Sequence, residues 1–263
     1  MKTELPPQLF EKVRRELGLE QPLHYLGRLE GGTLNRLYLL QCGEQQLVVK
    51  QGLPNQPCGS SWSEEYRLQR IAAELELAPR LLLQDTACKL MVMEHAGQPI
   101  TSPVSDGLVQ QAGRLLRTLH SSPCHLETRT YGDLLEQLLE QATIKGLDLS
   151  RLDLAAGRQI AAVWDKQPGC WCHHDLSPGN VLVKEGKPCL IDWEYSGRGN
   201  PAFDLACLAN SWKLGQNQLS LLLGTHNMGV DGEALQLAGK LVKLFDQLWY
   251  SLYQPGRDNA PHQ

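Results

Sequence analysis

Residues Trp171–Ala206 read WCHHDLSPGNVLVKEGKPCLIDWEYSGRGNPAFDLA, and this stretch decides how the rest of the chain is interpreted. Polar side chains alternate in it with short apolar runs. Gly and Pro interrupt it near residues 177–179, 185–188 and 197–201. This punctuation predicts a loop, a strand, a turn, a second strand, a second loop and a helix. We interpret the stretch as a functional site and the remaining chain as its support.

Two apolar runs on either side of Glu185-Gly186 should pair as a β-hairpin. Pairing Lys184 with Lys187 then brings Asn180 and Asp192 side by side at the open end of the hairpin. A carboxylate beside an amide oxygen suits Mg²⁺, which prefers hard oxygen ligands and takes few of them from the protein. The sequence therefore predicts a magnesium site at this end.

Asp175 lies five residues before Asn180, across a Pro-Gly turn. We expect its carboxylate to reach the same place, where it can accept a proton or align a hydroxyl group.

The segment Cys170-Trp171-Cys172-His173-His174 sets thiols and imidazoles next to each other. Such soft ligands could bind zinc. The paired C-x-x-C motifs of structural zinc sites are absent from the sequence, so a zinc-binding regulator remains a minor alternative.

The overall composition is that of an ordinary globular protein with a small-molecule partner. The chain has 263 residues, 42% of them hydrophobic, and its 25 Lys and Arg against 29 Asp and Glu give a formal net charge of -4. This charge offers no basic surface for nucleic acid and no polybasic patch for a membrane. The first residues are charged and amphipathic, and the eight cysteines show no disulfide framework, so we expect a cytoplasmic protein with reduced thiols.

The N-terminal part, residues 1–94, should form a small antiparallel sheet with helices. The capping motif Ser61-Trp62-Ser63-Glu64 predicts the start of a helix that runs to Leu75. Another amphipathic helix is expected at the start of the chain. The predicted elements are a helix over 7–19, strands over 23–29, 36–41 and 46–50, the helix over 61–75, and strands over 80–84 and 89–93.

A polar joint follows Glu94, and residues 95–263 should form a second, mainly helical domain. Leucine and alanine recur there at helical spacing. The predicted helices cover residues 108–119, 134–139, 152–164, 201–214, 218–223 and 233–253.

Three further signals are weak when taken alone. Gly31 and Gly32 could let backbone amides cover a phosphate, although adjacent glycines more often mark a tight turn. Lys50 ends an apolar strand, where a solvated strand end is the simpler interpretation. Glu65 lies in the first turns of the following helix. The sequence has no P-loop motif.

The motif His173-x-Asp175-x-x-x-x-Asn180 is followed twelve residues later by Asp192 and then by Phe203-Asp204-Leu205-Ala206. This two-part pattern resembles the signature of the aminoglycoside phosphotransferase and choline kinase superfamily. The resemblance implies an α+β, bilobal, protein-kinase-like fold, with a small antiparallel sheet and one helix in the N-terminal lobe and a mainly helical C-terminal lobe. The weak signals above occur in the order that the family pattern requires.

The resemblance also implies roles for individual residues. Lys50 would hold the α- and β-phosphates of ATP and pair with Glu65, while Asn180 and Asp192 hold Mg²⁺ and Asp175 receives the substrate hydroxyl. The remaining implied roles are phosphate cover by Gly31 and Gly32, adenine contacts from the backbone of Met93, Glu94, His95 and Ala96, and support of the catalytic loop by His173 and Asp204.

The pattern departs from the family at three points. The glycine turn lacks the G-x-G-x-x-G form, so phosphate cover is in doubt for each glycine. Glu64 could replace Glu65 as the partner of Lys50. The resemblance gives no role to His174.

Residues Ile191–Tyr195 and Asn200–Asp204 look closer to bacterial choline and thiamine kinases than to antibiotic-modifying enzymes. Aromatic faces attract quaternary cations. The candidate substrate contacts are Trp193, Glu194, Tyr195 and Trp249, of which Trp249 at helical spacing could equally belong to the core.

The sequence thus predicts an ATP- and Mg²⁺-dependent kinase of a small cationic alcohol such as choline, ethanolamine or thiamine. An aminoglycoside phosphotransferase is the second enzymatic interpretation, and a nucleotide-binding pseudokinase is the non-enzymatic one. The phosphate acceptor, the preference for ATP over GTP and the oligomeric state remain open.

Overall fold

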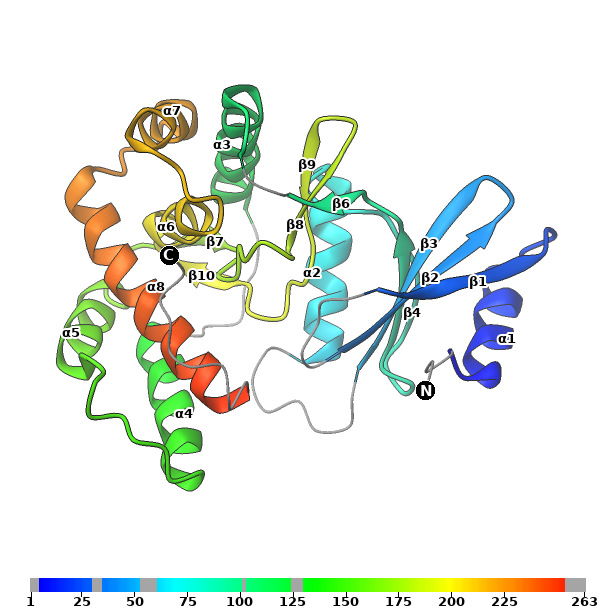
Figure 1. Ribbon diagram of the computed structural model, residues 1–263, viewed down its shortest axis with the longest axis horizontal. Coiled ribbons are helices and arrows are strands. Elements are labelled where there is room, and N and C mark those ends of the chain that lie inside the picture. The colour runs from blue at the N-terminus through cyan, green and yellow to red at the C-terminus, as the bar shows by residue number, and fades with distance from the viewer. Residues whose placement is uncertain (1–4, 30–34, 53–60, 101–102, 124–129, 254–263) are drawn as a thin grey trace. The chain divides into compact units, whose positions relative to one another are not determined.

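The computed structural model describes residues 5–29, 35–52, 61–100, 103–123 and 130–253 (Figure 1). Contacts divide the chain into two units, one of residues 1–101 and 178–195, the other of residues 102–177 and 196–263. A single cut after residue 94 would leave the hairpin around Glu185-Gly186 in the second unit. In the structure this hairpin belongs to the first unit, because its hydrogen bonds join it to that unit.

The first unit is built on an antiparallel sheet, as the sequence predicts. In the described residues its strands follow the order β1-β2-β3-β5-β4. The ends of the predicted strands are correct to within two residues. The strands are β1 (Leu23–Leu29), β2 (Asn35–Cys42), β3 (Gln45–Gly52), β4 (Leu81–Asp85) and β5 (Leu90–Glu94).

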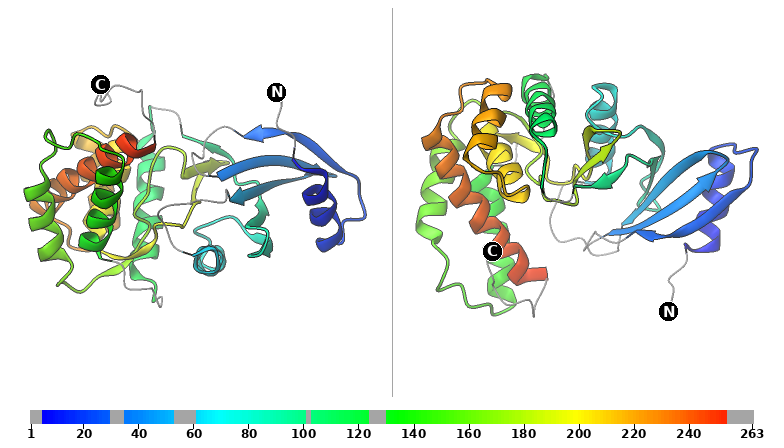
Figure 2. Two further views of the ribbon diagram at one scale, coloured as in Figure 1. Left: turned by 90° about the horizontal axis from the view of Figure 1, so that it is seen from below. Right: turned by 45° about the horizontal axis from the view of Figure 1, so that its top comes forward.

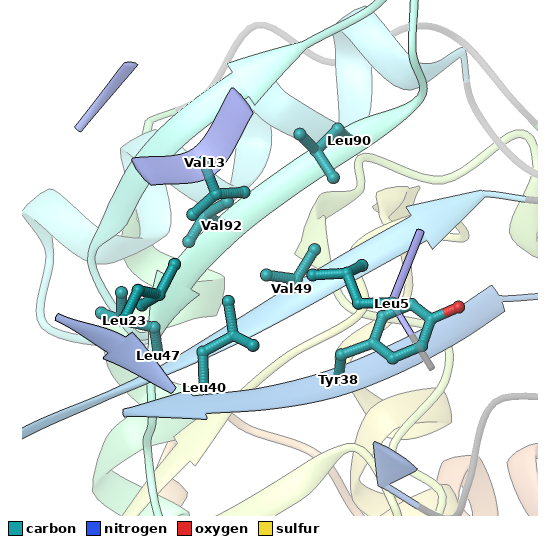
Figure 3. Close-up of a cluster of buried hydrophobic side chains, with 9 residues drawn as sticks. All are labelled: Leu5, Val13, Leu23, Tyr38, Leu40, Leu47, Val49, Leu90 and Val92. Carbon is teal, nitrogen blue, oxygen red and sulfur yellow. The ribbon is translucent and has the colours of Figure 1, made fainter. Parts of the chain in front are cut away.

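Helices α1 (Pro7–Glu16) and α2 (Trp62–Glu74) cover opposite faces of this sheet. Side chains alternate along a strand, so Val49 of β3 joins the apolar cluster under α1 (Figure 3). Val48 packs with the cluster under α2 instead. Lys50, two residues after Val48, therefore points to the α2 face.

The start of α2 follows from its capping residue. The Ser61 hydroxyl accepts a hydrogen bond from the Glu64 amide at 3.2 Å. Glu64 and Glu65 occupy the first turn, where acidic side chains complement the helix dipole. The predicted helix start is confirmed.

The hairpin of β8 (Val181–Lys184) and β9 (Lys187–Leu190) has the predicted register, with Lys184 opposite Lys187. The short strand β6 (Gln98–Pro99) pairs with β8 and completes a small sheet (Figure 2). The Leu190 amide also donates to the Leu77 carbonyl at 2.8 Å, which ties the hairpin to the segment after α2.

The second unit is mainly helical. Its long helix α8 packs against α4, α5 and α6, and α3 packs against α7 (Figures 1 and 2). The bounds of these helices are α3 (Asp106–Ser121), α4 (Tyr131–Ile144), α5 (Leu154–Trp164), α6 (Pro201–Ser211), α7 (Gln216–His226) and α8 (Gly232–Tyr253). Helix α6 is shorter than predicted, and α7 is longer. In the described ranges, none of the helices is long and apolar enough to span a bilayer.

A two-stranded ribbon in the second unit was not predicted. Strand β7 (Cys170–Cys172) pairs with β10 (Gly197–Gly199). Three residues are too few for an alternating pattern, and two of the three in β10 are glycines, which are rare in strands. The sequence therefore indicates loops there, and only tertiary pairing makes them strands.

We expect Gly97→Ala to lower the free energy of unfolding. Gly97 has φ +103°, and a Cβ there would lie 2.1 Å from the Val183 carbonyl oxygen. Left-handed strain and overpacking together should cost roughly 2 to 4 kcal/mol. Urea unfolding followed by tryptophan fluorescence measures this.

Gly179→Ala is the matched control in the same unit, because a Cβ at Gly179 meets nothing within 4 Å and its φ is not positive. Equal stability of the two variants would contradict the close approach at Gly97.

Candidate functional site

The first unit contains a buried lysine held between two carboxylates. Lys50 Nζ lies 2.5 Å from Glu65 Oε1 and 2.6 Å from Asp192 Oδ1. Lys50 comes from β3, Glu65 from the first turns of α2, and Asp192 from the residue pair after β9. The structure thus pairs Lys50 with Glu65. Glu64 is bound instead to Arg67 on the same helix, at 2.6 Å.

The charges around Lys50 hold it in its protonated form. Burial alone lowers the pKa of Lys50, but the attraction of Asp192, Glu65 and Glu194 outweighs burial and raises it above its ordinary value. Oxygen atoms of these three carboxylates lie within 4.8 Å of one another. One cation therefore faces three acidic groups, and the cluster has negative charge to share with a further cation.

The open end of the hairpin has the predicted arrangement. The Ile191 amide donates to the Asn180 carbonyl at 3.0 Å, so the residues flanking the hairpin, Asn180 and Asp192, are held at its end. Asp192 has φ +68°, a left-handed conformation that residues other than glycine rarely adopt. Such strain persists where the surrounding structure enforces it, often at functional sites.

In the second unit, buried Asp204 on α6 holds the loop that carries Asp175. Its carboxylate accepts hydrogen bonds from the backbone amides of His173, at 2.7 Å, and His174, at 2.8 Å. The Asp175 amide in turn donates to His173 Nδ1 at 3.3 Å. Asp204 and His173 therefore fix the backbone of residues 173–175. This fixes the position of the backbone from which the Asp175 side chain extends.

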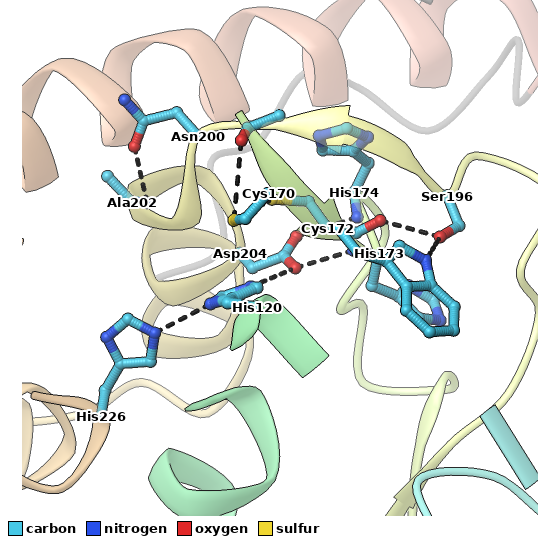
Figure 4. A network of polar contacts seen from close by, with 12 residues as sticks. His120, Cys170, Cys172, His173, His174, Ser196, Asn200, Ala202, Asp204 and His226 are labelled. Carbon is cyan, nitrogen blue, oxygen red and sulfur yellow. Dashed lines mark hydrogen bonds and ion pairs between the residues drawn. The ribbon is translucent and has the colours of Figure 1, made fainter. Parts of the chain in front are cut away.

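Two histidines that the sequence analysis missed complete this support (Figure 4). His120 Nε2 on α3 lies 3.0 Å from Asp204 Oδ2, and His120 Nδ1 lies 2.8 Å from His226 Nε2 at the end of α7. Burial and the nearby His120 lower the pKa of His226 to about 4, so it is neutral at pH 7. The only signal in the sequence was a polar residue on the apolar side of a predicted helix. Such a signal suggests a buried histidine but does not show which residue it contacts.

The structure also gives His174 a structural setting. His174 Nε2 lies 3.2 Å from the Tyr131 hydroxyl, which accepts a hydrogen bond from the Asn200 amide at 2.8 Å. A Cβ on Gly199 would lie only 2.1 Å from His174 Nε2, so a glycine is required beside the ring. His174 thus packs the loop against α4 and β10.

The predicted adenine contacts lie at the end of β5. Met93 is buried, and the Glu94 carboxylate is bound by Arg80 at 2.6 Å. The Glu94 amide donates to the Arg80 carbonyl at 3.1 Å, and contact of these residues with a nucleotide stays a prediction. The His95 amide donates to Gln46 at 3.0 Å, and Ala96 follows it. Gly31 and Gly32 lie outside the described residues.

The predicted substrate contacts have different environments. Trp193 is fully buried, with an exposed fraction of 0%, and Glu194 is buried beside Lys50. Tyr195 and Trp249 are half-buried. In α8 the Trp249 ring lies 5.3 Å from the Tyr253 ring. A role in binding a substrate stays a prediction for all four.

We expect Asp204→Asn to destabilise the protein in a pH-dependent way. Burial alone raises the pKa of Asp204, but the hydrogen bond and charge of His120, with the charges of His174 and His173, lower it from 3.8 to about 2. A lowered carboxylate pKa stabilises the folded state above pH 3.8, and this stabilisation disappears as the pH falls towards 2. The variant should lose roughly 2 to 3 kcal/mol at pH 7.

Urea unfolding at a series of pH values measures the difference between wild type and variant, which should shrink below pH 4. Glu140→Gln, an exposed position on α4, is the control. A difference that does not change with pH would contradict the proposed ionisation of Asp204.

The chain is similar to several known proteins. Protein LicA of Haemophilus influenzae is 40% identical over 55 residues, 21% of each chain, so the chain spans about a fifth of the length of that relative. Thiamine kinase of Shigella boydii is 26% identical over 185 residues, 68% of this chain and 62% of that protein.

The crystal structure of choline kinase LicA from Streptococcus pneumoniae superposes with a TM-score of 0.72 at 19% identity, over 97% of this chain and 94% of that one. The predicted α+β, protein-kinase-like fold is therefore confirmed. The model of the phosphotransferase enzyme family (APH) matches residues 26–225. With this match over most of its length, the chain belongs to the phosphotransferase enzyme family.

Proposed function

We propose that the protein transfers the γ-phosphoryl group of ATP to the hydroxyl group of a small cationic alcohol. The observation that carries the proposal is Lys50 Nζ between Glu65, at 2.5 Å, and Asp192, at 2.6 Å. A strand lysine paired with a helix glutamate is the device that kinases use to hold the α- and β-phosphates of ATP. Family membership supports the same reading.

The donor groups at the hairpin end fit Mg²⁺. Asn180 offers an amide oxygen, and Asp192 offers a carboxylate with Glu194 and Glu65 nearby. These are hard oxygen donors with excess negative charge, as Mg²⁺ requires. Asn180 and Asp192 would hold the ion, which would offset the charge of the phosphates when bound. Lys50 needs no ion to stay protonated, because three carboxylates face it.

Asp175 is the group that we assign to the acceptor hydroxyl. The loop that carries Asp175 is held by Asp204 and His173. Little conformational entropy is therefore lost when Asp175 is positioned for the reaction. In the transfer, the hydroxyl oxygen forms the new bond to the γ-phosphorus, the bond to the departing ADP breaks, and Asp175 accepts the hydroxyl proton. Positioning and charge, rather than covalent chemistry by the protein, are what phosphoryl transfer requires.

The proposal of a cationic acceptor rests on α8 and on the relatives. Trp249 is half-buried there, and the exposed Asp246 lies three residues earlier, hence on the same side of the helix. An aromatic face and a carboxylate together attract a quaternary or primary ammonium group. The similarity to a thiamine kinase over 68% of this chain favours the same class of acceptor.

We expect Asp175→Asn to lower kcat by about 10²- to 10⁴-fold, because the variant cannot accept the proton. Its affinity for ATP should be unchanged, since Lys50 and the hairpin end are intact. Coupled ADP release measures the rate, and calorimetric titration with a non-hydrolysable ATP analogue measures binding.

Asp148→Asn, an exposed loop variant, is the control and should match wild type. Wild-type activity in Asp175→Asn would disprove the assigned base. ATP binding without turnover on any acceptor would favour the pseudokinase.

A panel of choline, ethanolamine, thiamine and kanamycin separates the acceptor classes. We expect kcat/KM for one of the cationic alcohols to exceed that for kanamycin by at least about 100-fold. Mass spectrometry of the phosphorylated product identifies the acceptor. Phosphorylation of kanamycin alone would establish the aminoglycoside alternative.

Trp249→Leu should raise the KM for the preferred alcohol and leave the KM for ATP unchanged. Tyr250→Leu, the exposed neighbour on α8, is the matched control. Equal effects of the two variants would argue against Trp249 as an acceptor contact.

A further inference from the structure

Strand β7 places two thiols on one face. Cys170 and Cys172 alternate with Trp171, so both side chains point to the same side of the strand. Their Sγ atoms lie 3.7 Å apart. The proposed phosphotransferase reaction uses neither thiol.

A buried imidazole joins the two thiols. A ring nitrogen of His120 on α3 and the Sγ atoms of Cys170 and Cys172 all lie within 4.8 Å of one another. Figure 4 shows these side chains gathered around Asp204. The three groups come from two elements separated by about fifty residues, which is why the sequence does not reveal the cluster.

The spacing of the thiols is that of two ligands on one metal ion. Zn–S bonds of about 2.3 Å at a tetrahedral angle put two thiolates about 3.7 Å apart. Cys170 and Cys172 therefore need no rearrangement of the strand to share an ion. Two thiolates and an imidazole also form a donor set that binds Zn²⁺ in preference to Mg²⁺.

Each ring nitrogen of His120 has a partner. Its Nδ1 lies 2.8 Å from Nε2 of buried His226, and its Nε2 lies 3.0 Å from Asp204 Oδ2. A metal ion on one of these nitrogens would replace that contact, and the other nitrogen would keep its partner, which fixes the orientation of the ring. The Asp204 carboxylate adds negative charge beside the cluster.

The two histidines adjacent in sequence are turned elsewhere. His173 Nδ1 accepts from the Asp175 amide, and His174 Nε2 faces the Tyr131 hydroxyl. The arrangement of Cys170, Cys172, His173 and His174 as one zinc site is therefore wrong, because neighbouring residues point in different directions. His120 replaces them.

A cavity of about 330 Å³ lies beside Cys170, and its lining includes Gly169, Arg198 and Gly199. Cys170 is half-buried, and its Sγ lies 3.7 Å from the Gly199 carbonyl oxygen at the cavity wall.

We propose that Cys170, Cys172 and His120 form a binding site for a borderline-soft metal ion such as Zn²⁺. Bound metal joins α3 to β7 immediately before the loop that carries Asp175. Binding converts two neutral thiols to thiolates and releases two protons to solvent, so affinity rises with pH. The site is distinct from the Mg²⁺ ligands, which are oxygen donors in the first unit.

The test is a titration of the reduced, nucleotide-free protein with Co²⁺ and Zn²⁺. We expect one Co²⁺ per chain, with thiolate-to-cobalt charge-transfer absorption and a tetrahedral visible spectrum, displaced by one equivalent of Zn²⁺. Cys170→Ser should weaken binding by at least about 10-fold. Cys189→Ser, a half-buried thiol in the first unit, is the matched control and should bind like wild type.

A second measurement uses the wild-type protein and so does not depend on folding of a variant. Zn²⁺ should slow the alkylation of Cys170 by at least about 10-fold, followed by peptide mass spectrometry, and leave that of the exposed Cys88 unchanged. Absence of thiolate-to-cobalt absorption, or equal binding by Cys170→Ser and Cys189→Ser, would overturn the site. Neither readout depends on kinase activity.

Discussion

The buried cation of Lys50 is the constraint on which the first unit depends. An isolated ammonium group would lose its charge in such a place, because removal from water costs several kcal/mol per ion. Glu65 and Asp192 prevent this loss at 2.5 and 2.6 Å. The two partners come from α2 and from the end of the hairpin, so one ion joins three separate segments. The three carboxylates around this one cation leave an excess of negative charge.

The second unit uses a buried carboxylate in a corresponding way. Asp204 would be costly at 0% exposure without partners, and it has two loop amides and His120. Here the charged carboxylate binds the backbone amides of a loop and is not directed at a ligand. The loop that carries Asp175 is therefore set by hydrogen bonds from beneath it. The proposed metal ion on Cys170, Cys172 and His120 would link β7 to α3 within the same support.

The elements with clear periodicity could be predicted from sequence. The Ser61 cap located the start of α2, and the Glu185-Gly186 turn fixed the hairpin register. The β7–β10 ribbon could not be predicted, because its pairing is between three-residue segments with no pattern of their own. The contact units differ from a single cut after residue 94 for a related reason. The hairpin follows the loop that carries Asp175 in sequence, but its hydrogen bonds to β6 and to Leu77 place it with the first unit.

The sequence by itself determined the family and the candidate residues Lys50, Asp175, Asn180 and Asp192, because motif spacing and turn chemistry are local properties. Only the tertiary structure decided which charges meet. It paired Lys50 with Glu65 and not Glu64, and it brought His120 and His226 to Asp204 from helices far apart in the chain. A buried polar group needs a hydrogen-bond partner. Which residue becomes the partner depends on how the helices and strands pack, and a single sequence does not show which distant residues come close in space.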